Sequence, residues 1–207
     1  MNGNGRAWLV VESLLATGLT LYLALRLEIS SIWFVLPILL LILERRSLDD
    51  YGLELRITPP SVSAHLAIGL AGLAIYAAGH ILVAQLWAGQ VFSPRLPDDF
   101  GGLVFWQLLG VAIPEEIFFR GYLQTNLDRA FGRSHRIFGA LLGPGLFAQA
   151  ALFAICHLVT GDWMRLRVFF FALLAGWLRQ RSGSIAAPAL YHAIANAWVA
   201  ILESSFR

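Results

Sequence analysis

Long apolar runs alternate with short polar segments along the whole chain. Most runs approach the roughly 20 residues that an α-helix needs to cross a bilayer, and they hold few charges. The runs cover residues 7–25, 30–43, 64–88, 101–127, 138–159, 165–178 and 184–203. The pattern therefore predicts an all-α fold, a polytopic transmembrane helix bundle of about seven spans (six to eight).

Two polar segments separate the runs in the N-terminal half. Residues 44–60 contain Gly52 and the pair Pro59-Pro60, which we expect to stop any helix. We interpret this segment as an interfacial connector, because several of its apolar side chains could rest on the membrane surface. These side chains are Leu48, Tyr51, Leu53 and Leu55. Residues 89–102, rich in proline, glycine and aspartate, predict a loop before the fourth span.

Composition supports a membrane protein. Hydrophobic residues make up 58% of the 207 residues, charged residues only 14%, and the mean hydropathy is +0.69, outside the usual range for soluble domains. The first run is too long for a signal-peptide core and lacks a small-residue cleavage site, so we expect it to be retained. No polar stretch is large enough for a separate domain, which predicts one integrated membrane domain.

Every basic residue is an arginine, and most arginines lie between the runs. With a cytoplasmic N-terminus and seven spans, nine loop arginines fall inside and five outside, which favours this orientation. The net charge of +2 thus reflects loop arginines, and we expect no nucleic-acid partner. The nine are Arg6, Arg45, Arg46, Arg56, Arg129, Arg133, Arg136, Arg179 and Arg181.

Three charges interrupt the fourth run, in PEEIFFRGY at residues 114–122. Each charge facing lipid at a helix centre costs roughly 2.5 to 3.5 kcal/mol, so we expect all three to face the bundle interior. Glu116 and Arg120 are four residues apart, which predicts an ion pair. Glu115 points about 100° away from that pair and becomes the candidate general base. Pro114 removes a backbone hydrogen bond, which predicts that the span kinks or restarts there.

Two later runs carry polar side chains at helical spacing. In LFAICHL, Phe153 and His157 share one helix face; in YHAIANAW, His192 and Asn196 do so. A lone intramembrane histidine is often only hydrogen-bonded to a neighbouring helix, and the charges of the fourth run could form a structural ion pair. Histidines in two predicted spans, together with a glutamate pair in a third, indicate a functional site rather than separate structural contacts.

Three motifs appear in a fixed order on these runs: EEIFFR fits EExxxR, FAICH fits FxxxH, and HAIAN fits HxxxN. The chain therefore resembles the CPBP family (CAAX protease and bacteriocin-processing, also called Abi) of intramembrane endopeptidases. The resemblance predicts a CPBP-like catalytic core in residues 101–207, preceded by N-terminal transmembrane helices in residues 1–100. The stretch GWLRQRSGSIAAPALYHAIAN is also similar to the myxosortase-like bacterial subset, which trims C-terminal sorting tails.

The resemblance implies an endopeptidase of glutamic type that needs no cofactor. Its site residues map onto Glu115, Glu116, Arg120, His157, His192 and Asn196. The first glutamate and first histidine are implied to activate a water, the second histidine and the asparagine to form the oxyanion hole, and the Glu–Arg pair to orient the site. An exchange of roles between the two glutamates stays open.

Several alternatives compete with this interpretation. A zinc enzyme would use Glu115, His157 and His192 as ligands, but no HExxH is present and these residues lie on three different helices. The single cysteine, Cys156, neighbours His157 but points about 100° away from it, so we interpret it as a packing residue. A non-catalytic scaffold would use the same polar residues to bind a partner helix. A transporter is disfavoured, because only one broken span, at Pro114, is found.

The predicted partners follow from the apolar runs and the resemblance. We expect the bilayer itself and a membrane-anchored or lipid-modified protein substrate, cleaved near its C-terminal region. The exclusive use of arginine is typical of a bacterial genome rich in G and C, so the expected location is the bacterial cytoplasmic (inner) membrane. With the orientation above, His157 lies near the outer end of its span, which predicts a site that opens outward.

Overall fold

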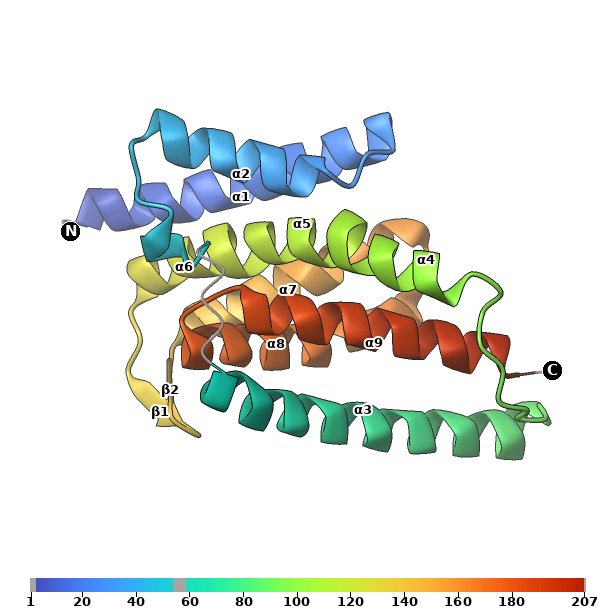
Figure 1. Cartoon of the computed structure of the whole chain (residues 1–207). Coiled ribbons are helices and arrows are strands. Elements are labelled where there is room, and N and C mark those ends of the chain that lie inside the picture. The colour runs from blue at the N-terminus through green and yellow to red at the C-terminus, as the bar shows by residue number, and fades with distance from the viewer. Residues whose placement is uncertain (1–2, 54–58, 207) are drawn as a thin grey trace.

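Seven long helices make up most of the molecule, a computed structural model that describes residues 3–53 and 59–206 (Figure 1). The all-α prediction is confirmed. The helices are α1 (Gly3–Leu27), α2 (Ile32–Leu43), α3 (Pro59–Ala88), a continuous helix Phe100–Phe131, α7 (Pro144–His157), α8 (Val168–Ser182) and α9 (Ala186–Ser204). Short 3₁₀ turns span Asp49–Tyr51, Leu158–Thr160 and Trp163–Arg167.

The continuous helix begins after Asp99, whose carboxylate accepts the Gly102 N–H at 3.0 Å. It continues through Pro114, so of the two predicted outcomes, a kink or a restart, the restart does not occur. π-helical turns lie on both sides of this proline, and such turns accommodate a missing hydrogen bond. In order, the segments are α4 (Phe100–Trp106), a π-turn (Gln107–Ala112), α5 (Ile113–Glu116), a π-turn (Ile117–Leu123) and α6 (Gln124–Phe131).

The helices form a layered bundle (Figure 1). The α1–α2 hairpin covers one side of the continuous helix, and α3 lies on the opposite side of the molecule against α9 and α8. Helices α7, α8 and α9 fill the space between. The main core gathers large side chains of the continuous helix, α2 and α7, including Trp33, Phe118, Phe119, Tyr122 and Phe153.

The predicted span at residues 138–159 was wrong in its first six residues. Residues 138–142 belong to a hairpin of β1 (His135–Ile137) and β2 (Ala140–Leu142), joined by a two-residue turn in which Phe138 and Gly139 both have positive φ, and Gly143 then precedes α7. Glycine accepts that backbone conformation without strain, which favours a tight hairpin turn over a helix.

The connector also differs from its prediction. Pro59 begins α3 rather than stopping a helix, as its fixed φ allows at a helix N-terminus. Tyr51 is fully buried in the bundle and does not rest on a membrane surface, whereas Leu48 is exposed. Leu53 packs against the main core, and Leu55 lies outside the described residues.

The count of about seven spans is not confirmed. Within the described residues, three helices are long and apolar enough to cross a bilayer: Gly3–Leu27, Ala67–Leu86 and Phe100–Phe131. Two apolar helices, α2 and α7, are shorter, and the 14 residues of α7 extend only about 21 Å. A hydrocarbon core measures about 30 Å, so these helices cannot span it alone.

Candidate active site

The predicted site residues come from three parts of the bundle. Glu115 and Glu116 end α5, and Arg120 follows in the second π-turn. His157 is the last residue of α7, while His192 and Asn196 lie one turn apart on α9.

The expected ion pair inside the continuous helix is confirmed. Nη1 of Arg120 donates to Oε1 of Glu116 at 2.8 Å, and both side chains are 0% exposed. Nε and Nη2 of Arg120 and Oε2 of Glu116 are buried without a hydrogen-bond partner. Because hydrogen bonds to charged groups are among the strongest in proteins, these open positions can accept a further polar group.

His192 lies between the two glutamates. Its Nδ1 donates to Oε1 of Glu116 at 2.8 Å, and its Nε2 is 3.9 Å from Oε2 of Glu115. The ring is almost fully buried. A carboxylate can only accept, so the Glu116 contact assigns a proton to Nδ1, and Nε2 carries a proton as well only in the imidazolium form.

Glu115 has a different environment from Glu116. Its Oε2 is buried without a hydrogen-bond partner, and its side chain is 15% exposed because it lines a cavity of about 260 Å³. His157 lines the same cavity. Most of the remaining wall is apolar and comes from the end of α1, the α1–α2 turn, the start of α2 and the 3₁₀ turn after α7, including Leu21, Ala24, Leu25, Ile29, Trp33 and Val159. Glu28, Ser30 and Arg165 add polar groups to the wall, so the cavity places Glu115 and His157 beside a mostly apolar surface.

The orientation of His157 follows from its own helix. Nδ1 donates to the carbonyl oxygen of Phe153 at 2.8 Å, and the two rings lie 4.5 Å apart. In the neutral ring this bond leaves the lone pair on Nε2, the nitrogen that can accept a proton.

Aromatic rings support the buried guanidinium. Arg120 lies over the ring of Phe153 at 4.5 Å and over the ring of Phe171, from α8, at 5.5 Å. Phe171 also contacts the ring of His192 at 4.8 Å. The sequence indicated Phe153 through its motif, but Phe171 belongs to an apolar FFF triplet in which no pattern marks one ring.

Asn196 is held by a partner that the sequence did not indicate. Its Nδ2 donates to Oε1 of Gln107 at 2.8 Å, in the first π-turn. Within the described residues no hydrogen bond links Asn196 to either glutamate.

The described residues do not group three His, Cys, Asp or Glu side chains as a metal site requires. Glu115, His157 and His192 therefore do not form the three-ligand set that the zinc alternative needs in this arrangement.

The match to known families agrees with this site. Residues 98–198 match the family described as type II CAAX prenyl endopeptidase Rce1-like. The match covers 101 of the 207 residues, so about half of the chain is similar to the Rce1-like family. That family consists of CAAX proteases, so the protein is a peptide hydrolase, and the predicted CPBP resemblance is confirmed. No curated protein and no solved structure matches the chain. The myxosortase-like subset stays a prediction.

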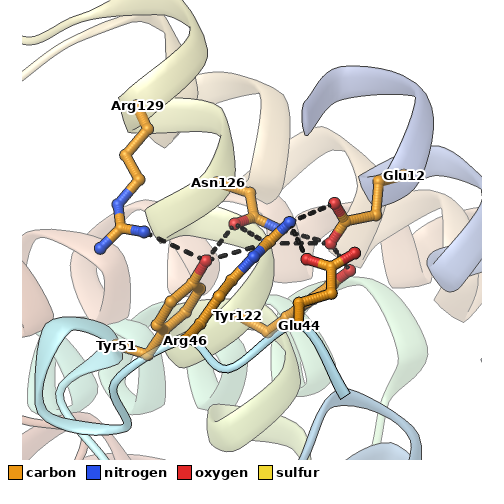
Figure 2. A network of polar contacts seen from close by, with 7 residues as sticks. All are labelled: Glu12, Glu44, Arg46, Tyr51, Tyr122, Asn126 and Arg129. Carbon is orange, nitrogen blue, oxygen red and sulfur yellow. Dashed lines mark hydrogen bonds and ion pairs between the residues drawn. The ribbon is translucent and has the colours of Figure 1, made fainter. Parts of the chain in front are cut away.

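A second buried carboxylate, outside the Rce1-like segment, was missed by the sequence analysis (Figure 2). Glu12 of α1 accepts from both Nη atoms of Arg46, at 3.0 and 2.6 Å, and from the Tyr122 hydroxyl. Nδ2 of Asn126 adds a longer contact of 3.4 Å. The signal was present, because a glutamate within an apolar run has to find a partner.

Tyr51 extends this network (Figure 2). Its hydroxyl donates to Oδ1 of Asn126 at 2.7 Å and accepts from Arg46 and Arg129. Burial raises the pKa of the Tyr51 phenol, with Arg46 opposing the shift, so the hydroxyl keeps the proton that it donates. The network joins α1, the connector and α6, at the end of α1 away from the cavity.

Proposed function

We propose that this Rce1-like protein is an intramembrane endopeptidase of glutamic type. One observation carries the proposal: the Glu115 carboxylate has a buried oxygen without a partner on a cavity that it shares with His157. A buried carboxylate oxygen that accepts no hydrogen bond from the protein can accept a proton from a water bound there.

Hydrolysis requires a general base, a water and the scissile carbonyl of the substrate in one cavity. Glu115 and His157 hold the water, whose oxygen attacks the carbonyl carbon of the scissile amide while its proton passes to Glu115. The C–N bond of the tetrahedral intermediate then breaks, and the proton goes to the leaving amine. Positioned general bases contribute about 10² to 10⁴ in rate.

The oxyanion is stabilised by His192 with Asn196. Because Nδ1 of His192 donates to Glu116, Nε2 donates to an oxyanion only from the imidazolium form. Gln107 orients the amide of Asn196. Glu116 and Arg120 hold His192 in place.

The cavity wall supports the proposed substrate class. Its apolar lining fits an extended segment of a membrane-anchored or lipid-modified protein, cleaved near its C-terminal region. The cavity lies at the end of the bundle that carries the α1–α2 turn, the end opposite the arginine-rich loops. We infer an outward-facing site in a bacterial cytoplasmic membrane, with the bilayer and the substrate as partners.

Proteolysis of a tail-anchored candidate substrate in liposomes tests the mechanism. The variants are Glu115→Gln and His157→Ala, with exposed Glu203→Gln and His135→Ala as matched controls. Cleavage that is lost in both site variants, kept in both controls and unaffected by phenanthroline is the expected result. Cleavage that phenanthroline abolishes and zinc restores would instead assign a metalloprotease. If the site variants still complement a deletion strain, the protein does not act as a protease, and the non-catalytic scaffold is the remaining interpretation.

A further inference from the structure

Residues at the ends of α6 and α8 line a second cavity. These helix ends lie opposite the α1–α2 turn (Figure 1). The volume of this cavity is about 540 Å³. Three arginines and two aspartates contribute half of its lining: Arg129, Arg133, Arg179, Asp50 and Asp128. None of them belongs to the proposed catalytic site.

Arg179 is the unusual member of this lining. It is only 7% exposed, its Nε is buried without a hydrogen-bond partner, and no ion pair or hydrogen bond reaches its guanidinium from the described residues. Gly52, with φ +65°, lies directly against the guanidinium, and a Cβ there would collide with it. A buried guanidinium nitrogen without a hydrogen-bond partner is costly, and although the Asp128 carboxylate of the same cavity favours the charge, it does not bond this nitrogen.

The other two arginines have protein partners. Arg129 donates to Asp50 at 3.0 Å and to Tyr51. Arg133 donates to the side chain of Gln180, which in turn donates to Oδ2 of Asp128. Both guanidiniums are thus fixed around the cavity, with Arg179 left open.

Helix ends explain only part of this arrangement. Arg129 and Arg179 lie in the last turns of α6 and α8, where the helix dipole favours cations. The dipole accounts for the sign of the charges. It leaves the hydrogen-bond donors of Arg179 unused.

We propose that this cavity binds a phosphate group, presented either by the headgroup of an anionic phospholipid or by free phosphate. A guanidinium fork matches two phosphate oxygens, and basic pockets at the ends of membrane helices suit phospholipid headgroups. Arg179 holds the phosphate from the cavity floor and Arg133 from its rim. Asp128 opposes the anion and limits its affinity.

Thermal unfolding of the purified full chain in a neutral detergent, followed by tryptophan fluorescence, tests the site. Phosphatidylglycerol, phosphatidylcholine and inorganic phosphate are added separately at constant ionic strength. A saturating ligand is expected to raise Tm by about 4–8 °C. A rise with phosphatidylglycerol alone assigns the lipid headgroup, and an equal rise with inorganic phosphate assigns free phosphate.

Variants localise the effect. Arg179→Gln and Arg133→Gln are expected to abolish the rise, and Arg181→Gln, an exposed arginine of the same helix, to keep it. Asp128→Asn should lower the ligand concentration at half-maximal shift. If Arg179→Gln does not fold, the Arg133→Gln variant, at an exposed position, still tests whether the rise in Tm depends on this cavity. No rise with either phosphate source, or an unchanged rise in the Arg179 and Arg133 variants, would overturn the proposal.

Discussion

Glu12 and Glu115 both lie inside apolar helices of this chain, and their surroundings differ. Every oxygen of Glu12 has a donor: Arg46 bonds both, and Tyr122 and Asn126 add to one of them. Glu115 has an oxygen without any donor and lines a cavity. A buried charge whose bonds are complete has no remaining capacity for a ligand, whereas an incomplete one on a cavity can bind a reactant. We therefore propose a stabilising role for Glu12 and a catalytic role for Glu115.

The same substitution at both positions should separate these roles most strongly. Glu115→Gln is expected to lower the rate of peptide hydrolysis by about 10²- to 10⁴-fold, because the general base is lost. Its Tm should stay near that of the wild type, since no hydrogen bond to Oε2 is broken. Single-turnover cleavage and thermal unfolding measure the two quantities. A large fall in the Tm of the Glu115→Gln variant would show that Glu115 also stabilises the fold, as Glu12 does.

Glu12→Gln should show the reverse pattern. The unfolding free energy is expected to fall by roughly 2–3 kcal/mol, less than for a fully buried pair because Glu44 still contacts Arg46. Cleavage by the folded fraction should remain near the wild-type rate. Unfolding in mixed micelles containing SDS gives the free energy.

The double variant Glu12→Gln with Arg46→Met serves as the control for that experiment. It removes both charges, so its destabilisation should be smaller than the sum of the two single variants. Additive effects would mean that Glu12 and Arg46 do not act as a pair.

Phe171→Leu is expected to weaken the site without breaking a hydrogen bond. Loss of one ring beside the desolvated Arg120 guanidinium should cost up to about 2 kcal/mol, which is up to about 30-fold in rate if the ring acts in the transition state. Phe170→Leu, at an exposed neighbouring ring, is the matched control. Equal effects of the two variants on kcat would show that packing alone matters.

Gln107→Leu should have the smallest effect. It removes one neutral hydrogen bond to Asn196, worth about 0.5–1.5 kcal/mol, so the rate should fall about 2- to 10-fold. The fall should appear in kcat with KM unchanged, because an oxyanion donor acts only in the transition state. A change confined to KM would place Gln107 in substrate binding instead.

Local periodicity accounts for what could be predicted. The apolar runs gave the long helices, and the spacing of four between Glu116 and Arg120 gave their ion pair, because both depend only on helix geometry. Local signals failed where backbone chemistry competed with hydropathy, as at the Phe138-Gly139 turn. The run there was apolar enough for a span, yet a hairpin formed.

The sequence by itself determined the helical class, the three motifs of an Rce1-like protein and the face shared by each motif's residues, since these are properties of neighbouring positions. Only the tertiary structure decided that His192 lies between both glutamates, that Phe171 and Gln107 support the site, and that Glu12 is satisfied while Arg179 is not. Each of these facts joins helices far apart in the chain, and whether a buried charge is satisfied depends on partners that no local spacing encodes.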